Sequence, residues 1–192
     1  MNIAVFVSGN GSNLQALIDA EKKGGLSSGK IKLVVCDKSD AFALVRAKKH
    51  NIPVFVLTGD RHASREEYDK VIIEELDQKN IGLIVLAGFM RILSGHFVNK
   101  YANRILNIHP ALLPAFKGAN GIKDAYDAGV DVTGVTVHFV IEELDSGPII
   151  FQEEVKIGKN ESLEKLEEKI HKVEHKLYPK AVRMFVDGEM RS

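Results

Sequence analysis

The sequence predicts an α/β fold: a Rossmann-like, mostly parallel twisted sheet of about seven strands with helices on both faces and an antiparallel strand pair near the C-terminal half. Short β-branched runs alternate with amphipathic stretches from residue 3 to residue 87, which is typical of parallel strands joined by covering helices. Two later runs, 132–141 and 148–157, are separated only by the short segment 142–147. Such a hairpin-like connection favours antiparallel pairing of the two strands.

The first half contains four apolar runs, which predict strands at 3–7, 31–36, 53–57 and 83–87. The amphipathic stretches between them predict helices at 12–23, 41–50 and about 64–79. The run at 83–87 is continuously apolar, which indicates a strand that is buried on both faces of the sheet.

The pattern changes after Gly95, where a short helix is expected at 97–101 and a fifth strand at 104–108. A loop with two prolines then leads to a helix near 122–128. The last helix is predicted from apolar residues at helical spacing: Leu163, Leu166, Ile170, Val173 and Leu177. Pro179 lacks a backbone donor, so we expect a kink or an interruption of this helix there.

The composition argues against several classes of partner. The 192 residues include 26 basic and 26 acidic ones without a block of like charge, which predicts neither nucleic-acid nor membrane-surface binding. Cys36 is the only cysteine, so it cannot form an internal disulfide, and we expect it to be a small buried residue. The longest apolar run, 81–90, is about half of what a bilayer requires, and the N-terminus lacks a signal-peptide pattern. We therefore expect a cytoplasmic protein.

The first candidate site is the turn Ser8-Gly-Asn-Gly-Ser-Asn-Leu14, between the first strand and the first helix. Glycines permit close backbone approach, and free N–H groups at a helix start attract an anion. Ser12 or Asn13 can cap the helix and donate to a phosphate oxygen. A single-phosphate site is the preferred interpretation. A plain tight turn stays an alternative, and so does a dinucleotide site with Asp37 on the ribose, although Leu14 replaces that motif's third glycine.

The second candidate site combines Asn107, His109 and Asp145. Residues two apart on a strand face the same side, and Pro110 ends the strand where a ligand would bind in an open α/β sheet. An amide can donate to a developing oxyanion, and a carboxylate near an imidazole orients the ring. These groups suit acyl-type transfer with attack by the substrate, because the sequence shows no nucleophile motif and no metal-ligand spacing. A hydrogen-bonded surface role for His109 stays an alternative.

The remaining histidines are expected to have no part in the chemistry. His138 is predicted to pack inside the sheet as a neutral, hydrogen-bonded residue that could contact Asp145. The others are expected on helix or loop surfaces: His50, His62, His96, His171 and His175.

Four segments resemble the folate-dependent formyltransferases: 8–14, Leu86-Ala-Gly-Phe-Met-Arg-Ile-Leu93, Asn107-Ile-His-Pro-Ala-Leu-Leu-Pro114 and Leu144-Asp-Ser-Gly-Pro-Ile149. The Asn-x-His-Pro and Leu-Asp-x-Gly-Pro segments belong to that family generally, and the Gly-Asn-Gly-Ser-Asn turn points to its phosphoribosylglycinamide formyltransferase branch. The resemblance implies transfer of a formyl group from 10-formyltetrahydrofolate to the amine of glycinamide ribonucleotide in de novo purine biosynthesis. It also implies one domain over 1–192, with a phosphate- or nucleotide-binding half at 1–100 and a catalytic and folate-binding half at 101–192.

The resemblance further implies which residues bind each substrate. The ribonucleotide and its phosphate would contact Gly11, Ser12, Asn13, Arg65, Gly118 and Glu174. The formyl donor would contact Met90, Arg91, Ile92, Leu93, Val98, Asn107, Ile141, Glu142, Glu143, Leu144 and Asp145. Arg65 and Glu174 could instead be exposed helix charges, and Leu93 or Val98 ordinary core. We expect small-molecule partners, no nucleic acid, no membrane, no metal, and a monomer or homodimer.

The predicted mechanism is direct transfer, in which the substrate amine attacks the formyl carbon. Asn107 and protonated His109 would stabilise the oxyanion, and Asp145 would hold His109 and an ordered water that relays protons. One loop departs from the pattern of some relatives. Lys117 replaces a commoner proline, and Ala119-Asn-Gly-Ile122 stands where some relatives carry histidines, which leaves the substrate contacts of this loop open.

Other functions stay open as alternatives, mainly a formyltetrahydrofolate deformylase-like hydrolase and a nicotinamide-dependent oxidoreductase. The deformylase carries a further domain before the first strand, and methionyl-tRNA formyltransferase needs a basic C-terminal domain, so neither is preferred. An oxidoreductase would use the glycine turn and Asp37 but would leave Asn107, His109 and Asp145 unexplained. A non-catalytic nucleotide-binding module would explain the turn alone.

Overall fold

The structure, a computed structural model, describes residues 1–59 and 64–190. Its strands are β1 (Asn2–Val7), β2 (Lys30–Cys36), β3 (Val54–Val56), β4 (Ile81–Leu86), β5 (Ile105–His109), β6 (Val132–Phe139) and β7 (Ile149–Lys156). Its helices are α1 (Ser12–Lys22), α2 (Phe42–Lys49), α3 (Arg65–Gln78), α4 (Gly95–Lys100), α5 (Gly121–Asp127) and α6 (Leu163–Val186). Each predicted strand and helix is present, with small shifts at its ends. The prediction for His62 lies outside the described residues.

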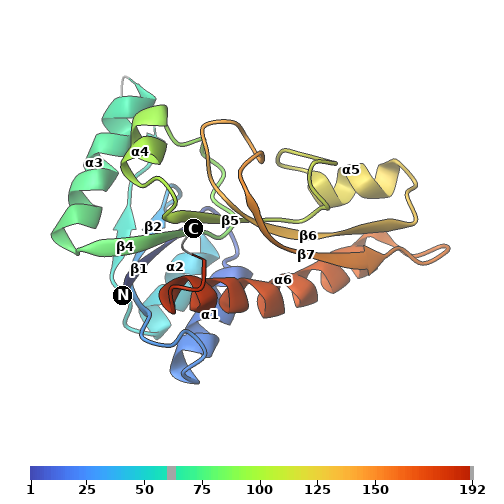
Figure 1. The fold of residues 1–192 in the computed structure, drawn as a ribbon, viewed down its shortest axis with the longest axis horizontal. Coiled ribbons are helices and arrows are strands. Elements are labelled where there is room, and N and C mark those ends of the chain that lie inside the picture. Colours follow the sequence, from blue (N-terminus) through green and yellow to red (C-terminus); the bar gives the residue numbers. More distant parts are fainter. Residues whose placement is uncertain (60–63, 191–192) are drawn as a thin grey trace.

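The strands form one seven-stranded sheet in the order β3-β2-β1-β4-β5-β6-β7 (Figure 1). Strands β3, β2, β1, β4 and β5 pair in parallel. Strands β6 and β7 are antiparallel, as predicted, and β5 and β6 are antiparallel as well, which the sequence did not predict. The chain runs outward from β1 to β3 and then returns to place β4 on the other side of β1. In sheets of this kind, ligands bind beyond the carboxyl ends of the strands at this change of direction.

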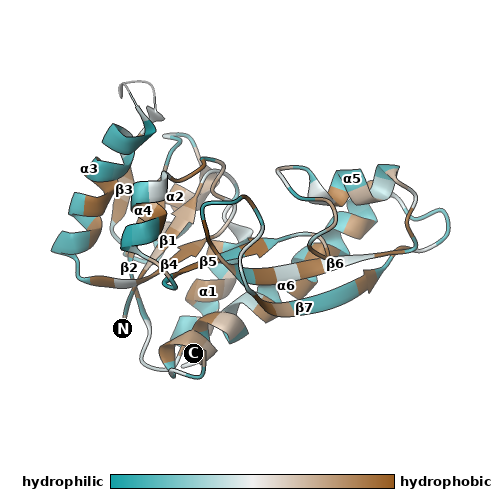
Figure 2. Ribbon diagram, turned by 45° about the horizontal axis from the view of Figure 1, so that its top comes forward, coloured by the Kyte–Doolittle hydropathy of each residue, from teal (hydrophilic) through white to brown (hydrophobic). Residues whose placement is uncertain are grey.

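Helices cover both faces of the sheet. Apolar side chains of α1, α2 and α6 pack on one face, and those of α3 and α4 pack on the other. Leu83, Ile84 and Val85 of β4 are fully buried, which confirms the predicted burial on both faces. In Figure 2 the inner strands β1 and β4 are coloured as apolar, whereas much of α3 and α4 is coloured as hydrophilic.

Helix α6 lies along β6 and β7 and continues through Pro179, so the predicted interruption is wrong (Figure 1). Tyr178, Val182 and Phe185 are buried on both sides of the proline, and the Tyr178 hydroxyl donates to two strand carbonyls. A proline inside a helix costs about 3 kcal/mol. Burial of each large apolar side chain is worth about 1.5–3 kcal/mol, so this packing outweighs the cost. Within residues 1–59 and 64–190, no helix is long and apolar enough to cross a membrane.

Candidate active site

A cavity of about 810 Å³ opens beyond the carboxyl ends of β1, β4 and β5. All but one of the predicted site residues line it: Gly11, Ser12, Asn13, Met90, Arg91, Ile92, Leu93, Val98, Asn107, His109, Gly118, Ile141, Glu142, Glu143, Leu144, Asp145 and Glu174. Arg65 is the exception, because it is exposed at the first position of α3 and is not among the lining residues. Asp37, the ribose-binding acid of the dinucleotide alternative, is not among them either.

The glycine turn at one end of the cavity is held from behind by α2. Gly11 has φ +74°, and a Cβ there would lie 2.7 Å from the Cβ of Ala43, so only glycine fits. Arg46 of α2 donates to the backbone oxygen of Asn10 at 2.9 Å and to its side-chain oxygen at 3.0 Å. Close packing and two hydrogen bonds from α2 therefore hold the turn, and a guanidinium charge lies beside it.

Capping of α1 by Ser12 or Asn13 was predicted, and this is wrong. Gly11 occupies the N-cap position without a side-chain cap, and Ser12 is the first helical residue. The left-handed turn at Gly11 brings the chain into the helix, so the two side chains already lie within its first turn. The first helical N–H groups therefore have no side-chain cap, and both residues line the cavity.

Glu174 joins the turn to α6 and points inward, which excludes the alternative of an exposed charge. It is 4% exposed, and its Oε2 accepts from Asn13 Nδ2 at 3.1 Å and from His171 Nδ1 at 2.9 Å. The hydrogen bond to Glu174 raises the pKa of His171 above its ordinary value. Asn13 Oδ1 is buried without a hydrogen-bond partner among the described residues, so a ligand donor can satisfy it.

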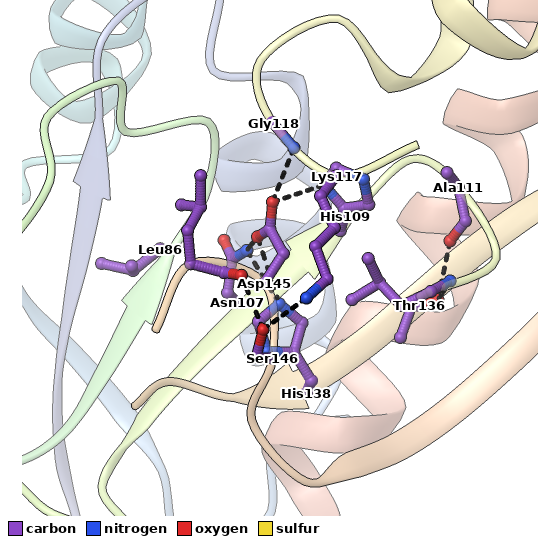
Figure 3. Close-up of polar contacts among 12 residues, drawn as sticks. Leu86, Asn107, His109, Ala111, Lys117, Gly118, Thr136, His138, Asp145 and Ser146 are labelled. Atoms are coloured by element: carbon purple, nitrogen blue, oxygen red, sulfur yellow. Dashed lines mark hydrogen bonds and ion pairs between the residues drawn. The ribbon is translucent and has the colours of Figure 1, made fainter. Parts of the chain in front are cut away.

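The three predicted catalytic side chains meet at the other end of the cavity (Figure 3). Strand β5 directs Asn107 and His109 to the same side, and the connection between β6 and β7 brings in Asp145. Asp145 Oδ2 lies 3.6 Å from His109 Nδ1, and Asp145 Oδ1 lies 3.5 Å from Asn107 Nδ2. His109 is 4% exposed, so it is not the surface residue of the alternative interpretation.

Asp145 is an ionised group in a mostly buried place. Burial opposes its ionisation, but the hydrogen bond from the Gly118 N–H at 2.9 Å and the nearby His109 ring outweigh it and hold the pKa of Asp145 below its usual range. On its other side, the His109 ring has Nε2 at 2.7 Å from the backbone oxygen of Phe116. Because a carbonyl oxygen only accepts, Nε2 carries the proton of that bond. Both ring nitrogens of His109 therefore face oxygen atoms, which fixes the ring's orientation.

The loop that departs from the family pattern closes against the turn that carries Asp145. Lys117 donates to the Ser146 hydroxyl at 2.6 Å and lies 3.6 Å from a carboxylate oxygen of Glu143. Gly118 donates to Asp145 in the same place (Figure 3). The lysine that stands in place of proline thus adds polar contacts between the two segments.

The histidines outside β5 are more varied than predicted. His138 is 2% exposed and hydrogen-bonded, which confirms its predicted packing. His96 and His171 are exposed, but His171 pairs with Glu174 and lines the cavity, which the sequence analysis missed. The spacing of three residues between them on a helix was the available signal. His50 and His175 are half-buried, so their predicted surface position holds only in part. Gln15 and Lys22 of α1 lie within hydrogen-bond distance of the His50 ring.

Part of the cavity wall is apolar. Met90, Ile92, Ile141 and Leu144 are large apolar residues with exposed side chains, whereas Leu93 and Val98 are buried and still line the cavity. Arg91 stacks over the Tyr68 ring with its guanidinium carbon 4.1 Å from the ring centroid. Pockets with an apolar wall and a few convergent polar groups suit a small organic ligand with a flat, partly apolar body.

Residues 1–182 match the formyl transferase family, to which the chain belongs, and the fold and the cavity are consistent with that class of protein. Within that family the similarity is to phosphoribosylglycinamide formyltransferases. The Escherichia coli (strain K12) protein of that name is 44% identical over 191 residues, which cover 100% of this chain and 90% of that protein. The crystal structure of the Bacillus halodurans protein superposes with a TM-score of 0.94 at 42% identity, covering 97% of this chain and 95% of that one.

Longer relatives also match. The trifunctional purine biosynthetic protein adenosine-3 of Gallus gallus is 46% identical over 191 residues, and that of Chironomus tentans is 47% identical over 190 residues. The matches cover 100% and 98% of this chain, but the chain spans only 19% and 14% of the length of these two proteins.

Proposed function

We propose that this protein transfers the formyl group of 10-formyltetrahydrofolate to the amine of glycinamide ribonucleotide, a step of de novo purine biosynthesis. The observation that carries the proposal is one cavity that is lined by the glycine turn, by the Asn107, His109 and Asp145 cluster, and by an apolar wall. A phosphorylated amine and a flat formyl donor can meet in such a cavity. The names of the similar proteins support the same reaction.

The ribonucleotide phosphate binds at Gly11, Ser12 and Asn13, where α1 begins and Arg46 lies behind the turn. The buried Glu174 carboxylate and the unsatisfied Asn13 Oδ1 accept from the hydroxyls of the sugar. Gly118 adds a backbone contact near the amine. Arg65 lies at the start of α3 and is not among the lining residues, so its contact with the ribonucleotide stays a prediction.

The formyl donor lies along the apolar wall, with its ring system against Met90, Arg91 and Ile92. Leu93, Val98 and the segment 141–145 complete this half of the site. The formyl carbon is then held between Asn107 and His109.

In the reaction, a bond forms between the amine nitrogen and the formyl carbon, and the bond from that carbon to N10 of the folate breaks. The amine loses a proton, and N10 gains one. Asn107 donates to the oxyanion that forms between these two events. Protonated His109 stabilises it by its positive charge, because both of its ring nitrogens face other oxygen atoms. Asp145, whose pKa is held low, stays ionised, orients His109 and balances its charge.

The test mixes the protein with 10-formyltetrahydrofolate, with and without glycinamide ribonucleotide, and follows folate deformylation and the formylated nucleotide. We expect conversion only when both substrates are present. Conversion without the nucleotide would favour the hydrolase, and no conversion together with saturable NAD binding would favour the oxidoreductase. The cytoplasmic location and the monomeric or dimeric state stay predictions, and size-exclusion chromatography of the pure protein tests the second.

A further inference from the structure

We propose that His138 is a positioning residue that selects the orientation of the Asn107 amide, so that its NH₂ group and not its carbonyl oxygen faces Asp145 and the reacting formyl group. This inference rests on the proposed formyl transfer. It assigns a role to a buried histidine that the mechanism above does not use.

The protonated nitrogen of His138 follows from its backbone contact. Nδ1 lies 2.8 Å from the backbone oxygen of Phe139, and this oxygen can only accept a hydrogen bond. Nδ1 therefore carries the proton. In the neutral ring the other nitrogen, Nε2, then has a lone pair and acts as an acceptor.

The acceptor at Nε2 faces the amide of Asn107. The two residues are directly paired across the antiparallel strands β5 and β6, and Asn107 Nδ2 lies 3.1 Å from His138 Nε2. Only the NH₂ end of the amide can donate to this lone pair. If the amide were turned over, Oδ1 would face the lone pair, and the bond would be lost in a place where His138 is 2% exposed.

Asp145 presents a second acceptor to the same NH₂ group. Its Oδ1 is 3.5 Å from Asn107 Nδ2 and 3.7 Å from His138 Nε2. The second separation exceeds a hydrogen bond, so Nε2 bonds to the amide and not to the carboxylate. One amide hydrogen is thus taken by His138. The other points to the side of Asp145 over a long contact and is available to an oxygen on the formyl carbon.

Two variants separate this role from simple packing. His138→Met keeps an unbranched side chain of similar length but removes the strong acceptor, and His138→Gln restores an oxygen acceptor. For His138→Met, with an oxyanion donor misdirected, we expect kcat to fall about 10- to 100-fold and the KM for the ribonucleotide to stay within about twofold. For His138→Gln, which keeps the acceptor, we expect kcat within about tenfold of the original. An equal fall in kcat in both variants, or a rise in the KM for the ribonucleotide without a fall in kcat, would overturn the proposal.

A double-mutant cycle tests whether His138 acts through Asn107. In an Asn107→Ala background, His138→Met should cause no further loss of kcat, because there is no amide left to orient. Thr136→Val is the matched control, since Thr136 is a fully buried polar residue of the same strand that bonds to Ala111 and Leu113 and not to Asn107 (Figure 3). Thr136→Val should change kcat by the same factor in the original protein and in the Asn107→Ala background. If His138→Met lowers kcat by the same factor with and without Asn107→Ala, the two residues act independently. His138 would then have a structural role, which would contradict the proposal.

Nitrogen-15 NMR of the histidine rings gives a readout that does not depend on activity. A neutral His138 ring protonated at Nδ1 is expected, and a proton on Nε2 would overturn the proposed orientation. If the original protein transfers formyl groups but shows the Nε2 proton, the positioning role alone fails. If it transfers none, the proposed function fails, and the catalytic role of His138 fails with it.

Discussion

The two ends of the cavity are built in different ways. The phosphate end is a continuous stretch, Gly9 to Asn13, whose conformation is imposed by one left-handed glycine and one neighbouring helix. The catalytic end is assembled from β5, β6 and the turn around Asp145, and its side chains meet only because these segments are in register. A local motif can bind an anion wherever its helix is intact. The catalytic cluster depends on the whole antiparallel part of the sheet. We therefore expect substitutions at the catalytic end to lower kcat and substitutions at the phosphate end to raise the KM for the ribonucleotide.

The largest expected effect is at the catalytic end. His109→Ala or Asp145→Asn removes a proton-transferring or charge-balancing group, which is worth about 10²- to 10⁴-fold in kcat. Ribonucleotide binding should persist, because the turn at Gly11 to Asn13 is untouched. Steady-state kinetics together with isothermal titration of the ribonucleotide measure both. Near-normal turnover in either variant would mean that the cluster does not carry the reaction.

At the phosphate end, Gly11→Ala should act in the opposite way. The new Cβ would lie 2.7 Å from the Cβ of Ala43, so the turn must shift, and we expect the KM for the ribonucleotide to rise about 10-fold or more with a smaller change in kcat. Gly24→Ala is a matched control, because Gly24 has nearly the same φ, +75°, but no atom within 4 Å of a new Cβ. An equal rise in KM for both variants would show that the shape of the turn is not what binds the phosphate.

Glu174 lies at the phosphate end but belongs to α6. Its substitution therefore tests whether ribonucleotide binding also depends on a residue outside the glycine turn. Glu174→Gln keeps the size of the side chain but removes a buried charge that accepts from Asn13 and His171. Loss of a charged hydrogen bond costs about 1.5–3 kcal/mol, so we expect the KM for the ribonucleotide to rise about 10- to 100-fold. Kinetics with varied ribonucleotide at saturating folate measure it. A fall in kcat at unchanged KM would place Glu174 in the chemistry instead.

The difference between the ends also explains what the sequence could predict. The glycine turn and the pair Asn107 and His109 were visible, because both follow from spacing within one strand and its exit. The contact between Asn107 and His138 was not, because it depends on the register of β6 against β5, which the long segment between them leaves undetermined. The continuous α6 was also missed. The cost of Pro179 is local, whereas the packing of Tyr178, Val182 and Phe185 that offsets it is tertiary.

The smallest expected effect is a pH dependence of stability at the phosphate end. Glu174 raises the pKa of His171 above its ordinary value of about 6.5, so the protonated ring contributes stability that is fully present below that pH and is lost as the pH rises through the raised pKa. The His171 side chain is 47% exposed, so solvent screening keeps the contribution below about 1 kcal/mol. Urea unfolding should therefore show His171→Gln to be less stable than the original protein at about pH 5.5 and nearly equal to it at about pH 9. His96→Gln, at an exposed position of α4, is the control and should show no such convergence. A constant difference at both pH values would mean that His171 supports this end of the cavity by packing and not by its charge.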